Sequence, residues 1–371
     1  MKVKLESFLQ EVSEKTTENN QYQVLTSSKV GLYLQSDYFN KQVASKDNKG
    51  YKIIKKGQFT YRAMSDTGEF FPNMLECTDI GIVSPAYPVF EIVKPVIIPE
   101  YLKYYFKSNG FQQSISSFAQ GSTRTSIKYG KLKTVSMDLP NLEEQKRVIA
   151  ILDTIHNIID SSKQELKMFD DLIKARFVEM FGDSASNEKG WKMNTFGDIC
   201  TVRQGLQIPI SKRLTEYEED SYEYITVQYL HGGKEKEYIK SPKESVKCTK
   251  DDILMTRTGN TGMVVTNVEG VFHNNFFLID FDRERFEKDF LVEYLNLDLI
   301  QADITRRAGT STIPDLNHGE FYKIKVFEPP IDLQKEFDEF KMQVDKSKVA
   351  VQKALDETQT LLDSLMQEYF G

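Results

Sequence analysis

Two long segments of the chain carry apolar residues at spacings of three and four, the periodicity of an amphipathic α-helix. They span residues 140–182 and 329–371, and each opens on a proline and closes on a glycine, as helix entry and a left-handed C-terminal cap favour. The apolar positions are Val148, Ile151, Ile155, Ile158, Ile159, Leu166, Phe169, Leu172, Ile173 and Met180 in the first, and Phe337, Phe340, Val344, Val351, Leu355, Leu362, Leu365 and Tyr369 in the second. The pattern predicts two long helices, each with one narrow apolar side.

The two helical segments repeat one another. Sliding the chain along itself until Pro140 meets Pro329 superposes them without a gap, and eight positions are then identical. This displacement, which we call the repeat shift, also pairs Tyr105 with Tyr294 upstream, so the preceding lobes repeat as well. The predicted layout is a lobe at 1–139, a helix at 140–182, a lobe at 183–328 and a helix at 329–371.

A narrow apolar stripe on helices of this length favours their pairing as a coiled coil. Tandem repeats that each end in a long helix pair these helices most easily in antiparallel fashion, under approximate two-fold symmetry, with the lobes at opposite ends. B-DNA presents the same groove about every 34–36 Å, so such a spacer would let each lobe meet a major groove. The alternative is that each helix packs only on its own lobe.

The lobes show shorter and more mixed patterns. Strands are indicated around 51–54, 81–84, 222–227 and 276–279, and one helix is indicated in each lobe, at 101–118 and at 287–307. The expected fold class is therefore α+β, with two mixed α/β lobes separated by two long helices in an antiparallel coiled coil of pseudo-two-fold symmetry.

Charge is distributed unevenly along the chain. The net charge is −7, yet residues 1–140 carry 18 basic and 13 acidic groups whereas residues 183–329 carry 19 and 25. Phosphate neutralisation needs positive surface, so a DNA-binding role would require partners to supply part of it. The apolar runs are shorter than the roughly 18 residues that span a bilayer. The N-terminus lacks an apolar signal region and the three cysteines are scattered, which indicates a cytoplasmic protein without membrane association or disulfides.

Motifs for catalysis within the chain are missing. Residues 328–331 read Glu-Pro-Pro-Ile, which lacks the amide and the aromatic ring that a DNA amino-methyltransferase needs to hold a flipped base. No phosphate-binding GxxxxGK[ST] loop occurs, and the histidines and cysteines do not stand at zinc-binding spacings. Asp315 with Glu320 and Lys323 is too irregularly spaced for a nuclease metal site and is interpreted as a surface turn. We expect a non-enzymatic chain without cofactor or metal.

With its PNLEEQKRVIAILD segment, the helix ending in MFG, and GDICTVRQGLQIP and DDILMTRTGNTG in the second lobe, the whole chain resembles the specificity subunits (HsdS) of type I restriction-modification systems. The resemblance implies that each lobe is a target recognition domain reading one half of a split, asymmetric site in double-stranded DNA. It also implies that the helices dock two methyltransferase subunits, joined by a restriction motor subunit in a nuclease complex. The bases read do not transfer between members.

Candidate DNA contacts are hydroxyl, amide and cationic side chains in glycine-punctuated loops, which suit close approach to phosphates and base edges. They are Ser122, Thr123, Arg124, Thr125 and Lys128 in the first lobe, and Arg203, Gln204, Arg257, Thr258, Asn260, Arg306, Arg307, Thr310 and Ser311 in the second. A competing hypothesis is a scaffold or inhibitor that only assembles methyltransferase subunits through its coiled coil, which the acidic second lobe favours.

Overall fold

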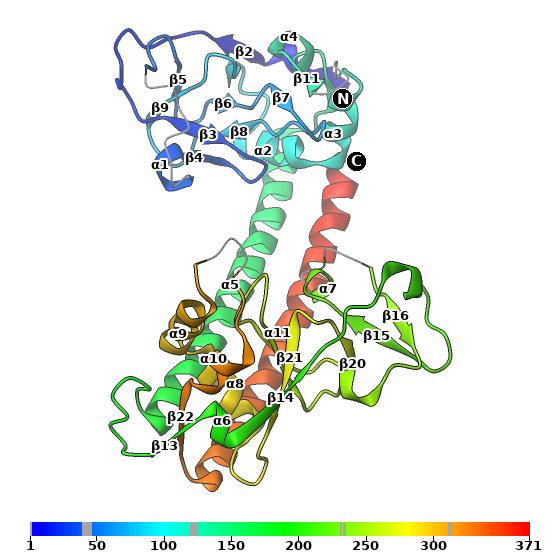
Figure 1. The fold of residues 1–371 in the computed structure, drawn as a ribbon. Coiled ribbons are helices and arrows are strands. Elements are labelled where there is room, and N and C mark those ends of the chain that lie inside the picture. Colours follow the sequence, from blue (N-terminus) through cyan, green and yellow to red (C-terminus); the bar gives the residue numbers. More distant parts are fainter. Residues whose placement is uncertain (1, 39–46, 119–124, 231, 233–234, 311–313) are drawn as a thin grey trace. The chain divides into compact units, whose positions relative to one another are not determined.

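The chain folds as two compact units (Figure 1). The computed structural model describes residues 2–38, 47–118, 125–230, 232, 235–310 and 314–371. The first unit combines Met1–Lys163 with Gln352–Gly371, and the second comprises Gln164–Val351. Each unit thus holds one lobe together with part of each long helix.

The first unit is built on a four-stranded sheet in the order β2-β10-β6-β8. Its strands are β2 Leu9–Val12, β10 Val89–Ile92, β6 Phe59–Thr60 and β8 Asn73–Met74, and all neighbours are antiparallel. The two-stranded pairs are β1 Lys2–Lys4 with β12 Ser136–Asp138, β3 Leu25–Ser27 with β4 Leu32–Leu34, β5 Lys52–Lys55 with β9 Ile80–Val83, and β7 Met64–Ser65 with β11 Thr125–Ser126. The short helices are α1 Gln35–Tyr38 and α4 Tyr129–Leu132. Stacked and edge-on contacts among Phe59, Phe90 and Phe106 form the centre of its core.

The second unit repeats this plan. The repeated sheet runs β14-β21-β18-β19, with strands β14 Cys200–Gln204, β21 Phe276–Phe281, β18 Ile253–Thr256 and β19 Val264–Val265. A second sheet runs β16-β15-β20-β17, with strands β16 Tyr238–Lys240, β15 Ser221–Ile225, β20 Gly270–Phe272 and β17 Lys247–Cys248. Its counterpart in the first unit is the two antiparallel pairs β3-β4 and β5-β9, which a parallel bridge between Val24 and Ile82 joins. The remaining elements are β13 Lys192–Thr195 paired with β22 Lys325–Glu328, and the helices α6 Phe196–Ile199, α7 Val227–Leu230 and α10 His318–Tyr322. The four segments predicted as strands all contain strands, and the predicted mixed α/β character of the lobes is confirmed.

The prediction of a single helix in each lobe is wrong, because each of these helices is broken in two. The first pair is α2 Pro99–Lys107 and α3 Asn109–Ser116, and the second is α8 Lys288–Asn296 and α9 Asp298–Ala308. The breaks fall at Ser108 and Leu297, which the repeat shift relates and which both have extended backbones. In each case a glutamine of the second helix donates its side-chain Nε2 to a carbonyl freed at the break, Gln112 to Phe106 O at 3.3 Å and Gln301 to Leu295 O at 2.7 Å. These contacts replace helical hydrogen bonds that are lost at the break. The apolar periodicity of the sequence does not predict them.

The two long helices confirm the prediction from the apolar stripes. They are α5 Leu142–Phe181 and α11 Ile331–Phe370, each of 40 residues, and the repeat shift relates both their starts and their ends. Within the second unit, Asp170 pairs with Lys348 at 2.6 Å and Arg176 with Glu336 at 3.0 Å, so residue numbers rise along one helix as they fall along the other. The helices are therefore antiparallel, as expected.

Each helix also packs on lobe residues, so the alternative prediction describes part of the packing. Leu152 and Ile159 of α5 belong to the core of the first unit, and Phe177 of α5 belongs to that of the second. At the helix ends, the ring of Phe370 lies 5.0 Å from that of Tyr101, and Phe181 lies 4.9 Å from Phe290. Much of the apolar stripe is thus shared between the partner helix and the lobes. Two of its predicted members do not follow it, because Ile158 and Leu172 are 47% and 46% exposed.

A buried glutamine at the start of each long helix shows that the repeat extends to individual hydrogen bonds. Gln145 accepts from Ile98 N and donates to the carbonyls of Val96 and Pro140. Gln334 makes the same three bonds, accepting from Glu287 N and donating to the carbonyls of Arg285 and Pro329, and the repeat shift relates every pair of partners. The two units therefore share one structural framework.

Candidate nucleic-acid interface

Two loops of the second unit lie side by side, at residues 257–263 and 314–317. We call these loops, and their counterparts in the first unit, the platforms of the candidate site. The first loop follows β18 and turns through Gly259 and Gly262, which both have positive φ angles that glycine adopts most easily. The second loop follows α9. They are joined by two hydrogen bonds, from Leu316 N to Arg257 O at 2.9 Å and from Thr261 Oγ1 to Pro314 O at 3.1 Å.

Arg257 is the centre of a polar network on this platform, which we call the Arg257 network and define as Gln204, Arg257, Asp315 and His318. Arg257 binds Asp315 bidentately, through Nε to Oδ1 at 2.8 Å and through Nη2 to Oδ2 at 2.7 Å. Its Nη1 donates to Gln204 Oε1 at 2.9 Å, and His318 Nε2 lies 2.9 Å from the same oxygen. Gln204 is itself held by its Nε2, which donates to Asn274 O at 2.6 Å. The guanidinium plane is therefore fixed on two sides.

The electrostatics of the Arg257 network follow from these contacts. Hydrogen bonds from Arg257 lower the pKa of Asp315, and those bonds in turn raise the pKa of Arg257. Burial, followed by the nearby Arg257 charge, lowers the pKa of His318, so its ring is neutral near pH 7. The amide oxygen of Gln204 can only accept, and His318 therefore carries its proton on Nε2. The network as a whole is an ion pair supported by neutral donors and acceptors.

The structure brings together only part of the candidate set in the second unit. Gln204, Arg257 and Thr258 lie together, because Thr258 forms a β-bridge with Asp315. Successive side chains of a strand point to opposite faces, so Arg203 lies on the other face of β14 from Gln204. There its Nη1 donates to Ser245 O at 3.3 Å.

The remaining members lie on the flanking loop and at the end of α9. Arg306 and Arg307 both pair with Asp303, one helical turn before them, and Arg307 also binds Glu320 at 3.2 Å. Asn260 and Thr310 are exposed, and Ser311 lies outside the described residues. Sequence reasoning missed Asp315 and His318 as members of the site, and the turn it assigned to Asp315 proves to hold the partner of Arg257.

In the first unit, three predicted contacts, Ser122, Thr123 and Arg124, lie outside the described residues. Thr125 lies on β11 and donates its Oγ1 to Ser65 O at 3.0 Å, whereas Lys128 is exposed at the start of α4.

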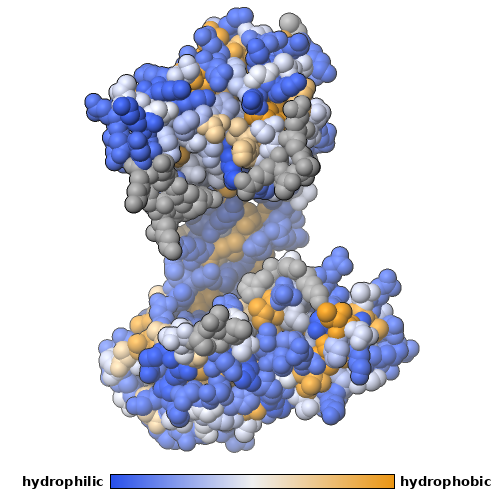
Figure 2. All heavy atoms as spheres, turned by 45° about the horizontal axis from the view of Figure 1, so that its top comes forward, coloured by the Kyte–Doolittle hydropathy of each residue, from blue (hydrophilic) through white to orange (hydrophobic). Residues whose placement is uncertain are grey.

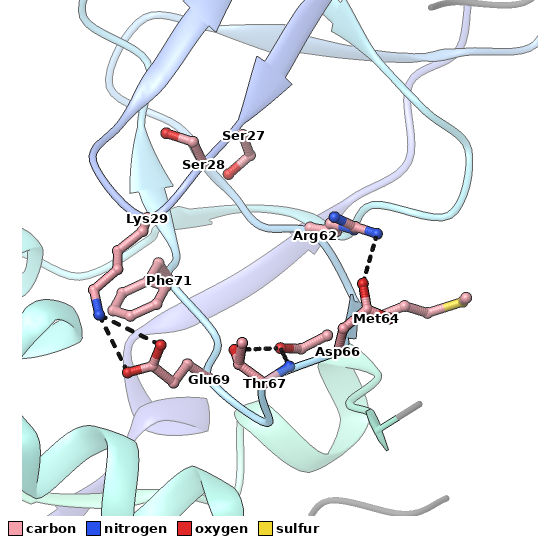
Figure 3. Close-up of a pocket in the computed structure, with 10 residues that line it drawn as sticks. Ser27, Ser28, Lys29, Arg62, Met64, Asp66, Thr67, Glu69 and Phe71 are labelled. Carbon is pink, nitrogen blue, oxygen red and sulfur yellow. Dashed lines mark hydrogen bonds and ion pairs between the residues drawn. The ribbon is translucent and has the colours of Figure 1, made fainter. Parts of the chain in front are cut away.

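A pocket of about 280 Å³ beside β7 was not predicted (Figure 3). Figure 3 shows Lys29 paired with Glu69 and Arg62 facing Asp66, at 3.3 Å and 3.8 Å respectively. In the sequence, Arg62 could have indicated this pocket, because it is the only arginine besides Arg124 in residues 1–140.

The corresponding loops of the two units share a backbone hydrogen bond and differ in side chains. Ile127 N donates to Ala63 O at 2.9 Å, as Leu316 N donates to Arg257 O, so Ala63 occupies the position of Arg257. The repeat shift likewise places Tyr129 where the second unit has His318. One framework therefore presents two different surfaces.

Among the residues that the structure describes, no group of three or more His, Cys, Asp or Glu side chains is arranged to hold a metal ion. The same residues contain no helix with the length and apolar character required to cross a bilayer. Glu328 of the Glu-Pro-Pro-Ile segment binds Arg285 through two hydrogen bonds of 2.9 and 2.8 Å and so takes part in an ion pair.

Comparison with known proteins gives one consistent result. The family described as "Type I restriction modification DNA specificity domain" matches residues 6–168 and 188–358. The MjaIX specificity subunit of Methanocaldococcus jannaschii is 26% identical over 157 residues, covering 38% of this chain and 36% of that protein. The StySPI specificity subunit of Salmonella potsdam is 23% identical over 306 residues, covering 73% and 64%. The chain thus spans less than two thirds of the length of these relatives.

Solved structures share the fold. The S subunit of a type I restriction-modification system from M. genitalium aligns over 100% of this chain and 96% of its own, with a TM-score of 0.59 at 16% identity. A chain from a study of complex assembly and conformational transition of the type I system aligns over 100% and 97%, with a TM-score of 0.60 at 17% identity.

Proposed function

The chain belongs to the type I restriction modification DNA specificity family, and from this premise we propose that it is the non-catalytic DNA-recognition subunit of a type I restriction-modification enzyme. Its target recognition domains are residues 1–139 and 183–328, and its spacer helices are residues 140–182 and 329–371. Each recognition domain reads one half of a split, asymmetric site in double-stranded DNA. The observation that carries the proposal is the pair of equivalent platforms with different side chains, since two unlike readers on one framework recognise two unlike half-sites.

Two methyltransferase subunits dock on the long helices, and a motor nuclease subunit joins them in a restriction complex. Leu172 and Leu361 support this docking, because they are identical under the repeat and yet 46% and 50% exposed. Figure 2 shows hydrophobic residues on the visible face of the long helices. Repeated exposed leucines would offer the same contact to two copies of one partner.

The docking is tested by the double variant Leu172→Ala/Leu361→Ala. We expect co-purification with the methyltransferase to fall at least tenfold while the thermal unfolding midpoint stays within about 2 °C, because surface substitutions alter stability little. Single variants should each lose one of two bound copies, which native mass spectrometry would resolve. Undiminished binding of two copies to the double variant would contradict this docking surface.

DNA contacts are made by the loops around the two platforms and by Arg203, which lies on strand β14 and points to another face. In the second unit the proposed contacts are Arg203, Gln204, Arg257, Thr258, Asn260, Arg306, Arg307, Thr310 and Ser311, and in the first they are Ser122, Thr123, Arg124, Thr125 and Lys128. Some of these arginines are held by carboxylates, which leaves less net positive charge for phosphates than their number indicates. Methyltransferase subunits supply the missing positive surface.

The function is tested by co-expression with the methyltransferase partner in cells that lack other DNA methylation, followed by single-molecule methylome sequencing. A split methylated motif with two unlike halves is the expected result. A complex that forms but methylates no defined motif would overturn the proposal and favour the scaffold or inhibitor, for which the acidic second unit argues.

A further inference from the structure

Among the residues that the structure describes, Arg257 uses only part of its hydrogen-bonding capacity. A guanidinium has five N–H donors, and three of those of Arg257 are engaged by Asp315 and Gln204. The two remaining donors belong to Nη1 and Nη2, which lie at the tip of the side chain. The side chain of Arg257 is 25% exposed, so solvent or a ligand can reach part of it.

The charge of the network disfavours a phosphate as its ligand. The carboxylate of Asp315 is 44% exposed beside the guanidinium and balances its charge. A phosphate near this pair would meet the negative carboxylate as well as the arginine, and neutralisation of phosphates depends on net positive charge. An uncharged partner with two directional acceptors suits the site better.

The geometry favours the major-groove edge of guanine. Guanine presents two acceptors side by side, N7 and O6, and an arginine held end-on donates to both. Holding the arginine in advance lowers the entropy lost on binding, and the bidentate Asp315 contact with the Gln204 support does this on two sides. His318 completes the support from beneath, because its Nε2 proton fixes the acceptor orientation of Gln204.

Two glycines beside the network lie in open surroundings. Gly259 and Gly309 stand on the loops that follow β18 and α9 and have positive φ angles, and no atom of the described residues lies within 4 Å of the place where a Cβ would be. Asn260 and Thr310 are exposed beside them. A nucleic-acid backbone can therefore approach both loops closely.

We propose that Arg257 reads a guanine in the half-site recognised by the second unit, with Asp315, Gln204 and His318 as positioning residues. The inference rests on the proposed DNA-recognition function. In the first unit Ala63 takes the place of Arg257, so this guanine contact belongs to one half of the target alone.

The experiment measures binding of the chain in complex with its methyltransferase to duplexes carrying the methylated motif. Each guanine of the second half-site is replaced in turn by 7-deazaguanine, which lacks the N7 acceptor. For the wild-type complex, one position should lose about tenfold in affinity, the size expected when a charged donor loses one of its two acceptors. The Arg257→Gln complex should bind the native and substituted duplexes equally.

Two further variants distinguish a loss of guanine recognition from a general loss of stability. Asp315→Asn keeps the arginine but weakens its hold, and should reduce the 7-deazaguanine effect to a few-fold. Arg283→Gln removes another ion-paired arginine of the second unit, which binds Asp252 at 3.5 Å, and should leave the full effect in place.

The outcomes distinguish the two proposals. If the wild-type complex recognises no split motif, the proposed function fails. If it recognises one whose second half has no sensitive guanine, or if Arg257→Gln keeps the full wild-type sensitivity, the guanine inference fails while the function stands.

Discussion

The two units of the molecule share their hydrogen-bonded framework and differ in the chemistry placed upon it. Buried Gln145 and Gln334 make the same three bonds, and Tyr105 and Tyr294 donate to equivalent carbonyls, those of Ser136 and Lys325. At other equivalent positions the first unit is apolar where the second is charged. Framework residues thus keep their contacts in both repeats, while the remaining positions are free to diverge.

Three divergent positions illustrate the difference. Ala63 corresponds to Arg257 on the platforms, as described above. Leu139 corresponds to Glu328, which binds Arg285 in a network with Asn194. Ile149 corresponds to Asp338, whose Oδ1 has no hydrogen-bond partner among the described residues. The second unit therefore carries electrostatic terms that the first lacks, and its stability should depend more strongly on pH.

The largest expected effect tests the shared framework. Gln145→Ala and Gln334→Ala each leave buried backbone groups without partners, so each should destabilise its own unit by about 3 kcal/mol. Unfolding of the second unit is followed by fluorescence of Trp191, the single tryptophan, and that of the first by hydrogen exchange. Gln359→Ala, an exposed control, should change neither. If only one of the two glutamine variants destabilised its unit, the two positions would not be equivalent.

A smaller effect is expected at Glu328. Hydrogen bonds, chiefly from Arg285, lower its pKa to about 2, so its contribution to stability is complete above the ordinary carboxyl pKa and is lost as pH falls toward 2. Glu328→Gln should therefore cost about 1–2 kcal/mol at pH 7 and much less near pH 2, after allowance for solvent screening. The matched control is Leu139→Ala in the first unit, whose cost should be the same at both pH values. If Glu328→Gln lowered the free energy of unfolding equally at pH 7 and pH 2, the ionised Glu328 carboxylate would not be the source of the stabilisation.

The smallest effect is a gain of stability at Asp338. Burial, followed by the charges of Asp289 and Glu287, raises its pKa to about 7, so the folded state loses stability as pH rises from about 4 through 7. Asp338→Asn should stabilise the second unit by about 1 kcal/mol at pH 8, a value reduced from the full shift because the carboxyl is partly exposed. It should have little effect at pH 4. Denaturant unfolding at both pH values measures the difference. An equal gain in stability at pH 4 and pH 8 would show that the Asp338 carboxyl does not cause the pH dependence.

Much of the fold could be predicted from local patterns in the sequence. The long helices begin and end close to their predicted bounds, since apolar periodicity, the entry prolines and the closing glycines are all local signals. The pairing of Arg306 and Arg307 with Asp303 was also accessible, because side chains three and four apart on a helix are neighbours.

The candidate site was less accessible. Arg257 was predicted, but its partner Asp315 lies 58 residues away and its support Gln204 lies 53 away. The loops also differ in length between the repeats. Gln112 binds Phe70 O and Gln301 binds Gly262 O, so the segment from Ala63 to Phe70 is longer than that from Arg257 to Gly262. The constant repeat shift could not align them.

The sequence by itself determined the tandem repeat, the two amphipathic helices, the mixed character of the lobes and the residue types available for binding, because these depend on neighbours along the chain. The tertiary structure alone decided where the lobe helices break, which arginine is held for recognition and which carboxylates hold it. Those outcomes depend on contacts between segments tens of residues apart, and a local pattern carries no record of which distant loop a side chain will meet.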